Sequence, residues 1–280
     1  MYCTFNRYLQ RWISRVFCFL LFSSGVLISV NSLAAQSGEE LLQKIHQARL
    51  QTYLLLTDYY NFSANVGDKH LLEGMAAGEN AIDSLIKRLS AGHDSPEYLA
   101  TLSQTQEHWV KYKSLLSQNI NDLKTLGYHE LQLVFQLAQL NVDVGTALGR
   151  LYQLVIDQKQ IKLPDVIIRT RHSAFTMAVM MTKYSARSTS NISQVFQGED
   201  PEETLDILAG EFDRNLGLLI NTDYVDTATN TLLKKAQIKW NFIRSSYMNY
   251  NENNVNFVVN LYSRQIIESL DISATAPMQG

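Results

Sequence analysis

The chain has 280 residues, 46% of them hydrophobic, so it is long enough to bury one large core or two smaller ones. Its net charge of −3 excludes a general attraction for nucleic acid or anionic lipid. Glycine (13) and proline (4) are scarce, which leaves few turn-forming residues and predicts an all-α fold of long helices with short connections.

Residues 1–35 have the pattern of a secretory signal peptide. Three arginines precede an apolar run at 16–30, and small residues at 32–35 match a cleavage site. The run is shorter than the about 20 residues of a comfortable membrane span, so we expect cleavage, with retention as an anchor as the alternative. Both cysteines, Cys3 and Cys18, lie in this leader. The mature chain is therefore expected to be periplasmic or secreted, without disulfides and without a membrane span.

Four segments with apolar residues at helical spacing follow the leader. The first ends near a turn at residues 65–68, and the second ends before residue 90. The third begins with Ser95 as its N-cap and Pro96 at its first position. The fourth is the longest, and its predicted apolar stripe consists of Leu131, Phe135, Ala138, Val142, Leu148, Tyr152 and Val155.

Pro164 interrupts the helical pattern because it has no amide hydrogen to donate inside a helix. Four more segments follow, and the first of them contains residues 166–184. A polar connection at 185–203 separates it from the sixth segment, which has the most regular stripe of the chain. That stripe consists of Leu205, Leu208, Phe212, Leu216 and Leu219.

The two sets of four segments contain matching motifs in the same order. "HWVKYKSLL" around Trp109 matches "KWNFIRSSY" around Trp240, and Arg49 aligns with Arg171. We therefore predict two tandem four-helix-bundle units, residues 36–158 and 159–272, stacked end to end through the junction of the fourth and fifth helices. Residues 273–280 are expected to form a flexible tail.

The chain resembles the N-terminal sensor domain of type IV pili methyl-accepting chemotaxis transducers. That family carries the motif R-x-R-M-x-x-Q-R-M-A-K, an acidic loop with Asp-Pro, a helix with F-x-x-x-L-x-x-L and a helix with a central Trp. The second unit carries matching elements at Arg169, Arg171, Met177 and Ala178, at "GEDPEE" from Gly198, at Phe212, Leu216 and Leu219, and at Trp240. The first unit keeps Arg49, the spacing of Ile82, Ile86 and Leu89, and Trp109.

The resemblance implies a sensory domain with candidate ligand-binding residues on the fifth helix. In the related sensor domains of nitrate-responsive histidine kinases, arginines of this helix hold an anion between subunits. The candidates here are Arg169, Arg171, the matching Arg49, and His172, which replaces the family's methionine. The family's Gln-Arg pair is absent, because Phe175 and Thr176 occupy those positions.

The two arginines of the fifth helix lie about 200° apart around the helix, so they do not share a face. Arg171 is in step with Phe175 and is expected to point inward or to lie at the rim of the bundle, where a carboxylate or a carbonyl must pair with it. A structural ion pair and a bound anion both meet this demand. Arg169 aligns with Gln47 instead of an arginine and is equally a candidate for ligand binding.

No motif of catalysis or of metal binding is present. The six histidines never recur at the i, i+4 spacing of a helical metal site, and the chain has neither a nucleophile motif nor a phosphate loop. We expect no enzymatic activity, no cofactor and no metal.

The expected function is that of an exported, non-catalytic sensory or binding module that acts through a protein partner. A pilin, a transducer ectodomain and an envelope protein are the candidate partners, and a homodimer is a further one. Two alternatives remain open: a small-anion or metabolite receptor that reports to a membrane transducer, and a structural accessory of a pilus or envelope complex.

Overall fold

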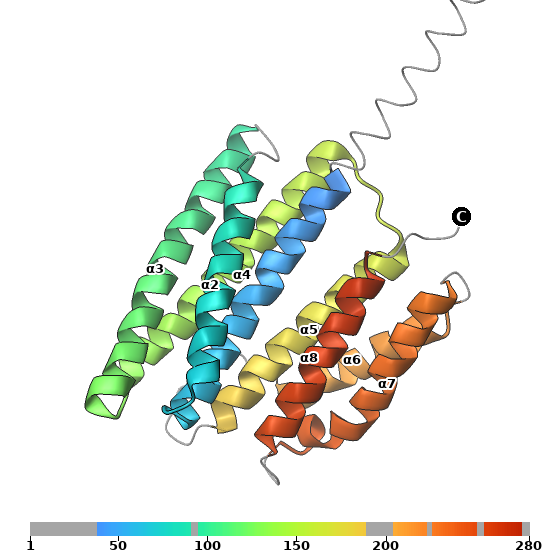
Figure 1. The fold of residues 1–280 in the computed structure, drawn as a ribbon. Helices are drawn as coiled ribbons and strands as arrows, with labels where there is room; N and C mark the ends of the chain where they lie inside the picture. Colours follow the sequence, from blue (N-terminus) through green and yellow to red (C-terminus); the bar gives the residue numbers. More distant parts are fainter. Residues whose placement is uncertain (1–37, 91–94, 189–203, 223–225, 251–254, 276–280) are drawn as a thin grey trace, which may run out of the picture.

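The computed structural model describes residues 38–90, 95–188, 204–222, 226–250 and 255–275 (Figure 1). The predicted signal peptide, the "GEDPEE" segment and most of the predicted tail lie outside these ranges. All regular structure within them is helical, which confirms the predicted all-α fold class. Within the same ranges, no helix is both long enough and apolar enough for a bilayer crossing.

The described residues contain eight helices, which form two four-helix units. The first unit consists of a helix at residues 38–64, called helix 38–64 below, and of α2 (Lys69–Leu89), α3 (Pro96–Leu126) and α4 (Leu131–Lys159). The second unit consists of α5 (Asp165–Ser188), α6 (Leu205–Ile220), α7 (Thr227–Met248) and α8 (Asn256–Ser273).

Local capping explains where several helices begin and end. Ser95 Oγ accepts the backbone N–H of Tyr98 at 3.2 Å, and Pro96 occupies the first turn of α3, as predicted. Asp68 caps α2 by accepting two backbone N–H groups. Gln160 ends α4 in the left-handed conformation (φ 52°), so the chain turns before Pro164 leads into α5.

Each unit has its own hydrophobic core with a buried tryptophan. Trp109 donates its indole N–H to Asp83 at 2.7 Å, and Trp240 donates to Asp213 at 2.8 Å. The cation four residues after each tryptophan pairs with the same carboxylate: Lys113 with Asp83 and Arg244 with Asp213. The same three-residue arrangement in both units supports the internal repeat that the sequence predicted.

The two units pack side by side, and the predicted end-to-end stacking is wrong. Gln43 donates to Asp271 near one end of helix 38–64, and Asn61 donates to Asn260 near the other end. Helix 38–64 and α8 therefore run antiparallel along most of their length. One physical reason is the turn at residues 160–164, which folds the second unit back beside the first. The other is that polar side chains of helix 38–64 pair with α8 across the junction.

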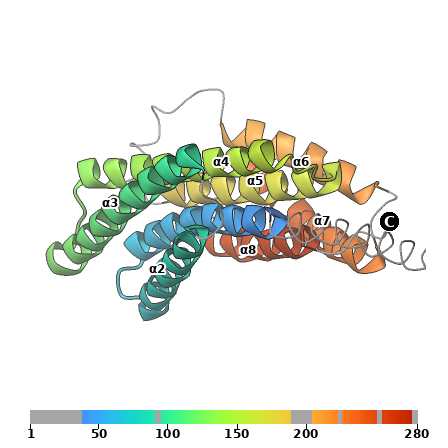
Figure 2. The ribbon, with the colours of Figure 1, turned by 90° about the horizontal axis from the view of Figure 1, so that it is seen from above.

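Viewed from above, the helices form two layers (Figure 2). One layer contains α3, α4, α5 and α6, and the other contains α2, helix 38–64, α8 and α7. Repeat-related helices lie in opposite layers, and helix 38–64 runs parallel to its counterpart α5. The units are thus related by an approximate two-fold axis along the helices, and helix 38–64, α4, α5 and α8 surround that axis.

The buried face of α4 differs from the predicted stripe. Leu131, Phe135 and Val142 are exposed, whereas Val134, Leu137 and Val144 are buried. The pattern was misread because Asn141, a polar residue, occupies a buried position of the true stripe. Asn141 also lines a cavity between α4 and α5.

Candidate ligand-binding site

Two arginines from matching positions of the repeat lie between the units. Arg49 comes from helix 38–64 and Arg171 from α5. The guanidinium of Arg49 lies 3.6 Å from the centre of the Phe175 ring and rests against α4 at Gly149, where the missing side chain leaves room for it. Arg171 is only 7% exposed, and its Nη1 donates to the hydroxyl of Tyr152 on α4 at 2.9 Å.

Neither arginine has a carboxylate partner among the described residues. The sequence correctly predicted that Arg171 points inward, but the partner that it finds is a hydroxyl and not a carboxylate or a carbonyl. The Nε atoms of both arginines are buried without a hydrogen bond to any described residue. Two cations thus lie between the units without a carboxylate from the described residues to pair with them, an arrangement that an anion would stabilise.

The pKa of His46 is affected by the two arginines. This histidine is buried on helix 38–64, and its Nε2 lies 3.9 Å from Asp271 on α8. Burial, followed by the charges of Arg171 and Arg49, lowers the pKa of His46 to about 3. The histidine is therefore neutral at pH 7, and it adds no charge of its own to the site.

A cavity of about 470 Å³ opens next to Arg49. It lies between α4 and α5, with helix 38–64 along one side and α6 at its rim. Its volume falls in the range of small-molecule sites. The wall combines apolar and polar side chains, among them Tyr53, Phe175, Val142, Val179, Thr146 and Asn141.

Asn141 is the unusual residue in this wall. It is 1% exposed, and both its amide nitrogen and its amide oxygen lack a hydrogen-bond partner among the described residues. Buried polar atoms are nearly always paired, and an unpaired amide costs free energy. The amide is therefore either a structural cost or a group that a ligand completes.

The four residues predicted from the sequence separate into two groups. Arg49 and His172 line the cavity, whereas Arg171, which donates to Tyr152, does not. His172 stands at the rim, 2.6 Å from Glu211 of α6. Arg169 is directed elsewhere, because its Nη1 donates to Asn215 of α6 at 3.0 Å and it does not line the cavity.

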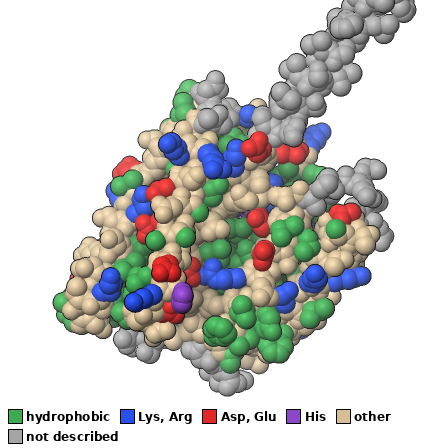
Figure 3. All heavy atoms as spheres, in the orientation of Figure 1, with side chains coloured by type: hydrophobic (Ala, Val, Ile, Leu, Met, Phe, Trp, Pro, Cys, Tyr) green, Lys and Arg blue, Asp and Glu red, His purple; other side chains and the backbone are tan. Residues whose placement is uncertain are grey.

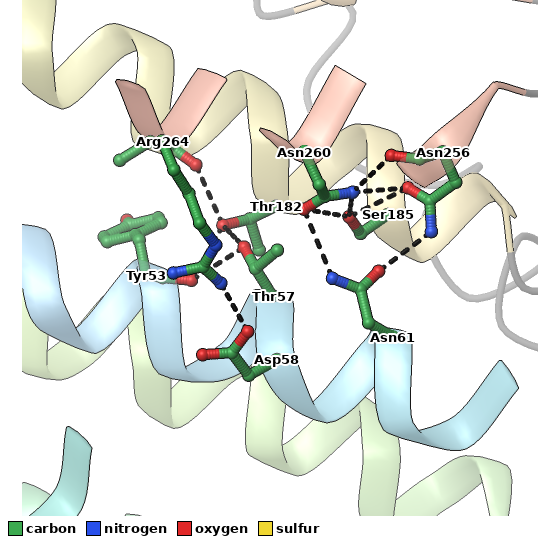
Figure 4. A network of polar contacts seen from close by, with 10 residues as sticks. Tyr53, Thr57, Asp58, Asn61, Thr182, Ser185, Asn256, Asn260 and Arg264 are labelled. Carbon is green, nitrogen blue, oxygen red and sulfur yellow. Dashed lines mark hydrogen bonds and ion pairs between the residues drawn. The ribbon is translucent and has the colours of Figure 1, made fainter. Parts of the chain in front are cut away.

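Direct polar contacts link the two units on the other face. Here Arg264 of α8 pairs with Asp58 of helix 38–64, and a chain of amides and hydroxyls links Asn61, Asn256, Asn260 and Ser185 (Figure 4). A second pocket of about 520 Å³ lies on this face between α2, helix 38–64 and α8. The face that these helices form is hollowed near its centre in the space-filling view (Figure 3).

Sequence reasoning missed Asn141, Tyr152 as the partner of Arg171, and His46. The available signal was a polar residue in phase with buried neighbours: Asn141 lies between Leu137 and Val144, and His46 lies four residues from both Leu42 and Leu50. Within the described part of the chain, no group of three or more metal-ligating side chains is close enough to hold an ion.

The fold and the site define an all-α protein of two repeated bundles, with one arginine from each bundle between them and a cavity beside Arg49. No protein-family model matches the chain, and no match emerged among the curated proteins or the solved structures.

Proposed function

We propose that this protein is an exported, non-catalytic sensory module that binds a small anion between its two units and passes the signal to a protein partner. The observation that carries the proposal is the pair Arg49 and Arg171, two inward cations without a carboxylate partner among the described residues. Arginine forms strong charge-assisted hydrogen bonds with carboxylates and oxyanions. The resemblance to the sensor domains of pilus-linked transducers supports the same reading.

The location of the site suggests how binding produces a signal. Arg49 belongs to the first unit and Arg171 to the second, so an anion held by both favours the arrangement in which the units are drawn together. A ligand shifts a conformational equilibrium only by its difference in affinity for the two states. The contacts to both units supply such a difference, because separation of the units removes half of them.

A thermal-shift and calorimetry panel of nitrate, sulfate, phosphate and small carboxylates tests anion binding. A true ligand at a hundredfold excess over its Kd raises the free energy of unfolding by about 2.7 kcal/mol. Arg49→Gln and Arg171→Gln are expected to abolish this gain, whereas Arg169→Gln, matched in charge and helix, keeps it. If no anion stabilises the wild-type protein, the anion-receptor function is excluded, and a structural role in a pilus or envelope complex is then favoured.

The surface suited to a protein partner lies on α7 and the start of α8. Phe242 and Phe257 are 66% and 80% exposed, and Ile238 and Leu261 extend the apolar area, which is visible over these helices in Figure 3. The matching positions of the first unit are different: Glu107 and Lys111, the counterparts of Ile238 and Phe242, form an ion pair on α3. Exposed apolar patches of this kind mark interaction sites.

The charge of α7 indicates the chemistry of the partner. The helix carries Lys234, Lys235, Lys239 and Arg244 and no carboxylate. A protein surface that combines apolar and acidic side chains complements it. We therefore assign the partner contact to this face, with an acidic protein such as a transducer ectodomain or a pilin as the occupant.

Phe242→Lys with Phe257→Ser is expected to abolish capture of the partner from a periplasmic extract while ligand binding is unchanged. The matched control is Lys111→Ala on the first unit, which leaves capture intact. The competing possibility is that a second copy of this chain binds the same surface, and sedimentation of the wild-type protein tests it. A dimer that the double substitution dissociates would show that this surface binds a second copy and not an acidic partner.

A further inference from the structure

We infer that the ligand is an organic carboxylate that carries a carboxamide-like group, and that Asn141 recognises this second group. The inference rests on the proposed function, because it assigns the charged end of the ligand to Arg49. It adds the class of ligand and a specificity-determining residue, and it predicts that a simple inorganic oxyanion fills only part of the site.

The size of the cavity is the first argument. A volume of about 470 Å³ exceeds what a triatomic or tetrahedral oxyanion needs, and it lies within the range of metabolite sites. An inorganic anion at Arg49 leaves the remainder of the cavity, including the wall at Val142 and Val179, without a ligand contact. A longer molecule contacts both ends.

The positions of the polar groups along α4 are the second argument. The guanidinium of Arg49 lies against Gly149, and Asn141 lies two turns earlier on the same face of the helix. The separation along the axis is about 12 Å, at 1.5 Å per residue. A ligand that reaches both residues therefore has a spacer of several methylene groups between its two polar ends.

The middle of the cavity fits such a spacer. Phe175 stacks against Arg49 and packs edge to face on Tyr53, with ring centres 5.1 Å apart. Val142 and Val179 continue the apolar wall toward Asn141. An alkyl chain buried there gains hydrophobic free energy without a polar partner.

The chemistry of Asn141 identifies the second end of the ligand. Its side chain offers a donor and an acceptor next to each other, and both lack a partner among the described residues. A carboxamide offers the complementary pair. The amide atoms are covered in this state, but no hydrogen bond to a described residue fixes them, so a change of side-chain rotamer toward the cavity costs no hydrogen bond.

The experiment compares two series of carboxylates on the full mature chain by calorimetry. One series consists of ω-carboxamido carboxylates from succinamate to suberamate, and the other of straight-chain carboxylates of equal length that end in methyl. We expect a Kd at least about tenfold lower for the best amide than for its methyl-ended match, because only the amide pairs with Asn141. Equal affinities in the wild-type protein overturn the inference without any variant.

Asn141→Leu supplies the second measurement. Leucine has a similar volume and removes both polar atoms, so the preference for the amide end is expected to disappear while nitrate and the methyl-ended series still bind. A preference that survives the substitution contradicts the role of Asn141. If nitrate binds through Arg49 but no member of either series does, the inference fails and the proposed anion site stands. If no anion depends on Arg49, the proposed function itself fails.

Discussion

Arg171 donates from Nη1 to the hydroxyl of Tyr152 at 2.9 Å, across the space between α5 and α4. This contact is the only hydrogen bond of the Arg171 side chain among the described residues, and its Nε has none. A buried guanidinium with one neutral acceptor is poorly compensated. The pair is therefore expected to lower the free energy of unfolding relative to an apolar pair.

The first prediction concerns the stability of this pair. Tyr152→Phe removes the acceptor and is expected to lower the free energy of unfolding by about 1–3 kcal/mol, because the buried cation loses its partner. Addition of Arg171→Met to that variant is expected to raise the free energy of unfolding again, to the wild-type value or above it, since methionine needs no partner. Urea unfolding in a buffer of large, weakly binding ions provides the measurement.

The control for this cycle is Arg169→Met, which changes the same charge on the same helix. Arg169 donates to Asn215 in a partly exposed position, so the effect is expected within about 0.5 kcal/mol. If Arg171 has a structural role instead, Arg171→Met lowers the free energy of unfolding more than Tyr152→Phe or Arg169→Met does.

The second prediction follows from the low pKa of His46. In the unfolded chain this histidine takes up a proton near pH 6.5, but in the folded chain burial, Arg171 and Arg49 delay protonation until about pH 3. The unfolded state thus binds more protons between these values. Stability is fully present above about pH 6.5 and is lost as the pH falls, with a contribution from His46 of about one to one and a half kcal/mol per pH unit.

The difference between the wild-type protein and His46→Gln isolates this contribution from that of other groups. The charged groups that face His46 are Arg49 on its own helix, Arg171 on α5 and Asp271 on α8. A bound anion offsets the two arginines, so ligand is expected to raise the pKa of His46 in an NMR titration. A histidine that titrates near 6.5 without ligand would refute the burial and field described above.

The architecture was predictable where residues act through periodicity. The stripes of helix 38–64 and α6, the N-cap at Ser95 and the tryptophans of both cores follow from spacing and local capping. The relation of the two units was not predictable from periodicity. It depends on polar pairs such as Asp58 with Arg264 and Thr57 with Thr182, whose members lie far apart in the sequence and appear as surface residues when read locally.

The candidate site was predictable only in part for a similar reason. The resemblance and the repeat indicated Arg49 and Arg171, but helical phase alone could not tell that Tyr152 of α4 reaches Arg171. Arg169 and Arg171 were equal candidates in the sequence. The structure separates them, because Arg169 donates to Asn215 of α6 whereas Arg171 is buried and donates to Tyr152 of α4.

The third prediction concerns the ion pair between the units. Burial raises the pKa of Asp58, and Arg264 opposes that effect. Arg264→Met is expected to cost about 1–3 kcal/mol at pH 7, less than for a fully buried pair because Arg264 is partly exposed. A second substitution, Asp58→Asn, is expected to recover much of the loss, since the carboxylate is then no longer buried without a cation.

The pH dependence of Arg264→Met checks the sign of this effect. Without Arg264 the folded pKa of Asp58 lies further above its unfolded value, so the carboxyl destabilises the fold as the pH rises and is tolerated below about pH 4. The cost of the substitution should therefore be smaller in acid than at pH 7. An equal cost at both values would show that packing of the arginine side chain, and not its charge, holds the units together.

The fourth prediction uses the repeated contact of tryptophan with aspartate. Asp83→Ala and Asp213→Ala each remove the acceptor of a buried indole N–H. Each also removes the partner of the cation that lies one turn after that tryptophan. Each is expected to lower the free energy of unfolding by about 1–3 kcal/mol, because hydrogen bonds to charged groups are stronger than average. The two aspartates belong to different units, so the double variant should show the sum within about 0.5 kcal/mol. Asp157→Ala, an exposed position on α4 whose carboxylate bonds only Gln153 among the described residues, serves as the control and should change little. A large effect in one unit with none in the other would mean that the matching contacts no longer play the same structural role in both copies of the repeat.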